Sequence, residues 1–159
     1  MPKKFETGRV RLVPSALKPL PMVIGFTGTR EGMSKGQQTQ LWKLMGKATE
    51  AHHGDCIGAD EQFHEVCAEL EIPIIIFPPD DDKLRAYCTS GNIIRIHPEL
   101  PYLIRNKLIV ETCEILIACP KERNEPPPQR GQGTWSTVRY ARRIGRRMRI
   151  LWPEAKVWD

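Results

Sequence analysis

Short apolar runs alternate with longer amphipathic segments along most of the 159-residue chain. The clearest runs are IPIIIF at 72–77 and EILIAC at 114–119, and a third, MVIGF, occupies 22–26. Continuous apolar runs of this length are typical of strands that are buried on both faces of a sheet. We therefore predict three buried strands, with 72–77 and 114–119 as neighbouring or near-central strands.

Weaker runs predict the remaining strands. HHGDCIG at 52–58 indicates a strand that leads into a loop, and IIRI at 93–96 and MRILW at 148–152 indicate two more. Between them, prolines, aspartates and a glycine predict a loop with one helical turn at 78–92. PKERNEPPPQR at 120–130 is predicted to be a proline-rich loop.

Four segments repeat apolar residues at helical spacing. Ser34 precedes the first and is a residue type that caps helix N-termini. Pro101 is expected in the first turn of the third helix. The segments are 34–51, the stretch with Phe63, Val66, Cys67 and Leu70, then 101–113 and 134–146.

Alternation of strands with helices predicts the α/β class. We expect a Rossmann-like three-layer sandwich with a mostly parallel sheet and helices on both faces. Pro14, Pro19 and Pro21 predict an irregular N-terminal arm at 1–21, and 22–159 are expected to form a single domain. In such folds ligands bind beyond the carboxyl ends of the strands. This rule selects TGTREG, DCIGAD, the 78–92 loop and RGQGT.

Composition adds few constraints. The chain is 40% hydrophobic and 27% charged, as in ordinary globular proteins. Its net charge of +5 favours anionic partners, but a charge of this size can also serve only to keep the protein soluble. Five cysteines without a CxxC pair suggest free thiols in a reducing compartment. With no signal-peptide core and no apolar span, we expect a cytoplasmic protein without membrane contact.

Two glycine-containing loops offer groups suited to a ligand. In the first, Gly28 permits a tight turn, and Thr29 and Arg30 supply donors for an anion. In the second, Gly58 allows close backbone approach, and Asp55 and Asp60 are predicted to accept hydrogen bonds from ribose hydroxyls. Asp60 can instead, or also, cap a helix. The dinucleotide fingerprint GxGxxG is absent from the first loop.

Potential zinc ligands cluster near the second loop. His53, Cys56 and His64 have suitable side chains, but no second ligand pair stands at the spacing of a structural zinc site. We therefore predict no metal, and we expect no cofactor.

A third site lies at the start of the helix predicted at 101–113. Arg105 and Asn106 stand where the helix dipole favours anions. The alternative is an exposed ion pair between Arg105 and Glu99 or Glu111, which would contribute little.

The segment 130–147 combines two signals. Its glycine-rich front is predicted to bind phosphate through the Gly131, Gly133 and Thr134 amides, and Trp135 is placed to stack on a base. The helix behind it presents an arginine stripe that we expect to point outward, either solvated or against a nucleic-acid backbone. The stripe consists of Arg139, Arg142, Arg143 and Arg146. The opposite side, which is expected to face the sheet, consists of Val138, Ala141, Ile144 and Gly145.

Together, GFTGTR, HHGDCIGAD, YLIRNKLIVETCEILIACP and RGQGTWSTVRYARRIG resemble the SLOG superfamily across residues 22–152. This Rossmann-like group includes the LOG cytokinin-activating phosphoribohydrolases and the DNA-processing protein DprA. The resemblance implies a nucleotide-type ligand held by these loops, and self-association into a homo-oligomer.

The resemblance also implies two activities. LOG enzymes cleave the N-glycosidic bond of nucleoside monophosphates with an arginine, matched by Arg105, and the glutamate of PGGxGTxxE, where this chain has Thr137. Threonine cannot stabilise an oxocarbenium-like centre as a carboxylate does, unless Glu99, Asp55 or Asp60 replaces it. DprA-like proteins bind single-stranded DNA.

Of these functions, we favour a sensor or nucleotide-processing protein. It would bind a mononucleotide, a cyclic nucleotide or an ADP-ribose derivative. A LOG-type phosphoribohydrolase and a DprA-like single-stranded DNA-binding module are the alternatives. Nucleic-acid binding is expected to be weak.

Overall fold

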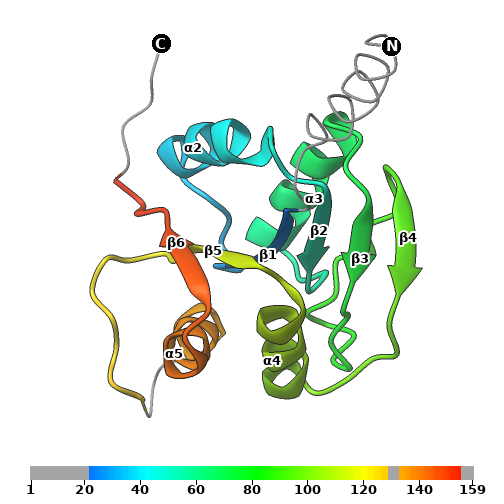
Figure 1. The fold of residues 1–159 in the computed structure, drawn as a ribbon. Helices are drawn as coiled ribbons and strands as arrows, with labels where there is room; N and C mark the ends of the chain where they lie inside the picture. The colour runs from blue at the N-terminus through cyan, green and yellow to red at the C-terminus, as the bar shows by residue number, and fades with distance from the viewer. Residues whose placement is uncertain (1–21, 129–132, 155–159) are drawn as a thin grey trace, which may run out of the picture.

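The computed structural model describes residues 22–128 and 133–154, which form a six-stranded, entirely parallel sheet (Figure 1). The strand order is β4-β3-β2-β1-β5-β6, so the chain adds strands outward on one side of β1 and then crosses to the other. The predicted N-terminal arm lies outside the described residues. The strands are β1 Val23–Gly28, β2 Glu50–His53, β3 Ile74–Ile76, β4 Ile93–Ile96, β5 Ile115–Cys119 and β6 Arg147–Ile150.

The four described helices cover both faces of the sheet (Figure 1). Helices α2 and α3 bury side chains against one face, and α4 and α5 against the other. This confirms the predicted three-layer α/β sandwich. The helices are α2 Lys35–Met45, α3 Ala59–Glu69, α4 Tyr102–Thr112 and α5 Thr134–Ile144.

The two clearest apolar runs became β3 and β5, each one strand in from an edge. They are not neighbours, because β2 and β1 lie between them. Parallel pairing of β1 with both β2 and β5 makes β1 the point where the strand order reverses. Ligands of open α/β sheets bind outside the carboxyl ends of the strands at this point.

Large apolar side chains fill the face under α2 and α3. Phe26 of β1 and Phe63 of α3 stack with ring centroids 4.4 Å apart, and Leu41 and Met45 of α2 are fully buried beside them. Each such side chain stabilises the fold by about 1.5–3 kcal/mol when removed from water. The packing orients α3 so that its N-terminus lies at the carboxyl ends of the strands, where ligands of such sheets bind.

The helix boundaries follow local chemistry. The predicted Ser34 cap is confirmed: its hydroxyl accepts from the Gln37 amide at 3.1 Å, and the Gln37 side chain accepts from the Ser34 amide at 2.9 Å. Helix α2 ends at Met45, earlier than expected. Pro101 immediately precedes α4 instead of lying in its first turn.

Two further local expectations differ from the structure. Ile144 was placed on the buried face of α5, but it is 41% exposed, because it is the last helical residue and lies beyond the packed turns. Strand β2 ends at His53, earlier than the predicted 52–58, because Asp55 adopts a positive φ of 55° that breaks the extended backbone.

None of the described helices has the length and apolar character needed to cross a bilayer. All five cysteines have free thiols, and Cys67, Cys113 and Cys119 are buried.

Candidate functional site

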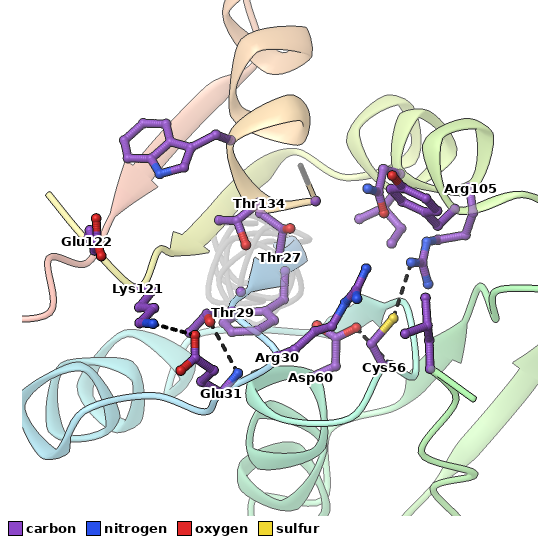
Figure 2. Close-up of a pocket in the computed structure, with 18 of the residues that line it drawn as sticks. Thr27, Thr29, Arg30, Glu31, Cys56, Asp60, Arg105, Lys121, Glu122 and Thr134 are labelled. Carbon is purple, nitrogen blue, oxygen red and sulfur yellow. Dashed lines mark hydrogen bonds and ion pairs between the residues drawn. The ribbon is translucent and has the colours of Figure 1, made fainter. Parts of the chain in front are cut away.

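A cavity of about 500 Å³ opens at the carboxyl ends of β1 and β5, where the strand order reverses (Figure 2). The volume lies within the range of about 300–1,000 Å³ that is usual for small-molecule sites. Four elements provide most of the lining: the loops after β1 and β5 and the N-terminal ends of α4 and α5. The predicted site residues that line it are Gly28, Thr29, Arg30, Asp60, Arg105, Asn106, Gly133, Thr134 and Trp135.

Two predicted site residues are not brought to this cavity, and a third cannot be placed. Asp55 is buried elsewhere, where its carboxylate accepts from Arg85 Nε and from the Cys88 amide, both at 3.0 Å. Gly58 has a φ of 99°, and a Cβ there would lie 2.2 Å from the Arg30 carbonyl oxygen, so it serves close packing of two loops. Gly131 lies outside the described residues.

Arg105 is the most unusual group of the site. Only 4% of this side chain is exposed, and its Nη1 donates to the carbonyls of Gly54 and Phe77, the latter at 3.0 Å. Its Nη2 donates to the Cys56 sulfur at 3.3 Å (Figure 2). Among the described residues, Arg105 Nε is the one buried side-chain nitrogen or oxygen atom without a hydrogen-bond partner. A buried cation with an unused donor beside a cavity favours an anionic ligand.

The predicted alternative for Arg105, an exposed ion pair, is wrong. Glu99 pairs with Arg85 at 2.7 Å, and Glu111 accepts a hydrogen bond from the Tyr140 hydroxyl. The position of Arg105 depends on Gly54 at the end of β2. A Cβ on Gly54 would stand 2.1 Å from Arg105 Nη1, so only glycine lets the guanidinium lie against this backbone.

Asp60 places a carboxyl in the same cavity. It does not cap α3, which begins at Ala59; instead its Oδ2 accepts from the Cys56 amide at 3.1 Å. Burial raises the pKa of Asp60 to about 6, while the nearby Arg105 opposes that rise. Asp60 therefore changes its charge close to neutral pH.

Cys56 lies between these two groups. Burial raises the pKa of its thiol, Asp60 adds to the rise, and Arg105 opposes it. A neutral thiol is a poor nucleophile. Cys56 therefore acts here as a weak hydrogen-bond acceptor for Arg105.

The N-terminus of α5 forms another side of the cavity. Gly133 precedes the helix with a φ of 48°, and both the amide and the hydroxyl of Thr137 donate to its carbonyl, at 3.0 and 2.9 Å. The first amides of the helix, including that of Thr134, have no partner one turn earlier in the helix, and the helix dipole makes this end favourable for anions. The geometry suits the phosphate position predicted from the sequence.

The position of the LOG glutamate is occupied by a buried hydroxyl that is engaged within α5, so Thr137 contributes no carboxylate. Two of the three possible replacements are also absent from the cavity, because Asp55 and Glu99 both bind Arg85. Asp60 is the one that lines it.

The histidines considered as zinc ligands form a buried hydrogen-bonded chain. His53 Nδ1 accepts from the Asp55 amide at 2.9 Å, so its Nε2 is the donor to His64 Nδ1 at 2.8 Å, and His64 Nε2 in turn donates to the Ser90 carbonyl at 2.8 Å. Burial holds the pKa of His53 well below its usual range. In the described part of the chain, no group of three or more potential ligands is arranged to hold a metal ion.

The segment 121–126 after β5 supplies cavity residues that the sequence did not indicate. Lys121, Glu122, Asn124 and Pro126 all line the cavity, and Lys121 forms a 2.7 Å ion pair with Glu31 at one side of it (Figure 2). The sequence places this segment in a proline-rich loop, and no motif or period marks it as part of a site.

The arginine stripe of α5 points outward as expected, with Arg142 and Arg143 exposed, but its side chains also bind groups of the protein. Arg139 and Arg142 form ion pairs with Glu125, at 2.9 and 2.8 Å. Arg146 Nε donates to the Val110 carbonyl at 3.0 Å, and Arg143 lies over the Tyr140 ring. Most of the stripe is therefore engaged with the protein itself.

Comparison with known proteins supports the fold. A scan against protein-family models and a search of curated proteins give no match. Among solved structures, the chain is similar to the molybdenum cofactor binding protein from Rippkaea orientalis (TM-score 0.62, 19% identity, covering 84% of this chain and 77% of that one). It is also similar to the Moco carrier protein from Chlamydomonas reinhardtii (TM-score 0.60, 19% identity, 86% and 80% covered).

A third similar structure is DprA from Streptococcus pneumoniae (TM-score 0.57, 18% identity, covering 82% of this chain). The match includes 50% of the DprA chain, so the present protein corresponds to half of that protein. At these identities the likeness concerns the fold. DprA is one of the proteins that the SLOG resemblance named, and the fold predicted from that resemblance is confirmed.

Proposed function

We propose that this protein binds a small phosphorylated ligand with a planar heterocycle, of nucleotide type, in the cavity at the ends of β1 and β5. The observation that supports this most is the buried guanidinium of Arg105, whose Nε has no partner and whose side chain forms no salt bridge within the described residues. Burying such a charge is costly unless it is paired. A phosphate oxygen would supply both the charge and the missing acceptor.

Four further groups fit a phosphate at this position. The α5 N-terminus provides the Gly133 and Thr134 amides and the Thr134 hydroxyl, and Arg30 lines the same cavity. In this arrangement a sugar hydroxyl would bind Asp60, and the heterocycle would lie toward Trp135.

The molybdenum cofactor is a second candidate ligand. Two structures with the same fold are named as proteins that bind or transport it. It also combines a phosphate with a planar heterocycle, so the same anion-binding groups would serve. The protein would then be a carrier.

The two remaining alternatives have less support from the described residues. Hydrolysis of LOG type needs a carboxylate where Thr137 is buried. Binding of single-stranded DNA needs free cations, whereas Arg139, Arg142 and Arg146 already bind protein groups. Weak, salt-sensitive DNA binding and self-association remain expectations from the sequence.

A thermal-shift screen tests the proposal. The panel contains AMP, GMP, cyclic AMP, ADP-ribose and the molybdenum cofactor, and it is applied to the wild type, Arg105→Gln and the control Arg149→Gln on the edge strand β6. A ligand at a hundred times its Kd stabilises the fold by about 2.7 kcal/mol. We expect this increment in the wild type and Arg149→Gln, but not in Arg105→Gln. Absence of any stabilising compound, or an unchanged increment in Arg105→Gln, would refute the proposal.

A further inference from the structure

The side chains of segment 121–126 line the cavity, bind other elements of the protein or, in the case of Lys121, do both. Those of Glu122, Asn124 and Pro126 line the cavity. The intervening residues bind other elements of the protein through ion pairs, which are Lys121 with Glu31, Arg123 with Glu154, and Glu125 with both Arg139 and Arg142.

These ion pairs fix the segment although it forms neither strand nor helix. Two guanidiniums from successive turns of α5 hold Glu125, and they keep the pKa of its carboxyl below the usual range, with Arg142 as the main cause. Arg139 also donates to the Pro126 carbonyl. A single exposed ion pair contributes little, but a network that converges on one segment can hold it in position. The segment is therefore a preformed wall of the cavity.

Glu122 and Asn124 have polar groups available to a ligand. Neither side chain makes a hydrogen bond or ion pair with any other residue in the described ranges 22–128 and 133–154, and both line the cavity. The Glu122 carboxylate only accepts hydrogen bonds, whereas the Asn124 amide both donates and accepts. A phosphate would be repelled by Glu122, so the ligand must present hydrogen-bond donors at this wall.

We infer that Glu122 and Asn124 recognise a 2-amino-4-oxo pyrimidine edge, the chemistry that guanine and pterin rings share. This edge presents a ring N–H and an exocyclic amino group side by side, which match the two oxygens of one carboxylate. The neighbouring oxo group accepts from the Asn124 amide. The inference rests on the proposed function, because it assumes that the phosphate of the same ligand lies near Arg105 and the α5 N-terminus.

Adenine and hypoxanthine provide the contrast. Adenine places a ring nitrogen acceptor where guanine has an N–H, so an acceptor would face the Glu122 carboxylate. Hypoxanthine keeps the ring N–H but lacks the amino group. Sites built around such hydrogen bonds discriminate strongly, because the protein group is left without its partner when the wrong ring binds.

Calorimetric titration with four probes tests the inference: GMP, IMP, AMP and neopterin monophosphate. We expect GMP or neopterin monophosphate to bind at least about tenfold more tightly than AMP, with IMP intermediate, as one bidentate pair provides. The stronger of the two 2-amino-4-oxo probes identifies the source of the ring. Glu122→Gln should weaken that probe about tenfold and leave AMP unchanged, while Glu69→Gln, on α3 away from the cavity, should change neither.

Other outcomes overturn the inference in distinguishable ways. Equal affinities for all four probes would remove the ring specificity but leave the proposed function intact. Equal weakening of AMP and GMP by Glu122→Gln would assign the carboxylate to the sugar hydroxyls instead. Failure of all four probes and of the wider nucleotide and cofactor panel to bind would overturn the proposed function, and the inference with it.

Discussion

Replacing Asp60 with asparagine should stabilise the folded protein at neutral pH. The side chain is buried, and desolvation raises the pKa of Asp60 from an ordinary value of 3.8 to about 6, although Arg105 and the Cys56 amide favour the charged form. The ionised carboxylate is therefore less favourable in the folded state than in the unfolded chain. Asparagine keeps an oxygen that can accept from the Cys56 amide, but it adds no charge.

The size of the effect follows from the two pKa values. One pKa unit corresponds to about 1.4 kcal/mol, so the difference between 3.8 and about 6 amounts to roughly 3 kcal/mol. Because the folded-state pKa is the higher one, the favourable contribution of protonated Asp60 is complete below pH 3.8. It is lost as the pH rises through 6. The wild type should therefore lose stability relative to Asp60→Asn over this interval.

Urea unfolding of the wild type and Asp60→Asn at intervals from pH 4 to pH 8 measures this difference. We expect the two proteins to approach each other near pH 4 and the variant to lead by up to about 3 kcal/mol at pH 7.5. Glu69→Asn, on the exposed end of the same helix, is the matched control and should show no such pH dependence. A constant difference between wild type and Asp60→Asn across the pH range would refute the argument.

Three other changes test the remaining parts of the site. Gly133→Val should abolish ligand binding, because no protein atom within 4 Å would oppose a Cβ and the side chain therefore enters ligand space; the φ of 48° strains a β-branched residue, so circular dichroism of the unliganded variant accompanies the calorimetry, and binding that survives in a folded variant would contradict the prediction. Incubation with AMP should release little or no adenine and ribose 5-phosphate, since Thr137 lacks a carboxylate, whereas robust release would contradict this. Glu125→Gln should weaken ligand binding severalfold by loosening the cavity wall, while Arg143→Gln should not; equal effects would remove the positioning role of Glu125.

The fold was predictable because the apolar side chains of its main strands must be buried on both faces of the sheet. The apolar runs that became β1, β3 and β5 require burial on both faces, which a parallel sheet between two helical layers provides. Strand β2 was harder, because its EAHH sequence contains two histidines. His53 is buried at low cost only because His64 and the Asp55 amide satisfy both ring nitrogens, and this requires tertiary contacts.

The site was predictable where it depends on strand ends and less so where it depends on side-chain partners. The loop after β1 and Gly133 at the start of α5 line one cavity, because the carboxyl ends of parallel strands meet at one edge. Asp55 and Asp60 are chemically identical in the sequence, yet Arg85 takes the first and the cavity receives the second. The wall at 121–126 depends on ion pairs between distant residues, which no local pattern records.

The burial of Arg105 supports the proposal that this arginine serves ligand binding. Its Nη1 donates to the Gly54 and Phe77 carbonyls, which a neutral donor could also do without the cost of burying a charge. No carboxylate in the described structure forms a salt bridge with it, and its Nε stays unpaired. Asp60 interacts with Arg105 electrostatically without a direct salt bridge, and burial raises the pKa of its carboxyl to about 6. We therefore expect a phosphorylated ligand to supply the direct acceptor and close counter-charge that this guanidinium lacks among the described residues.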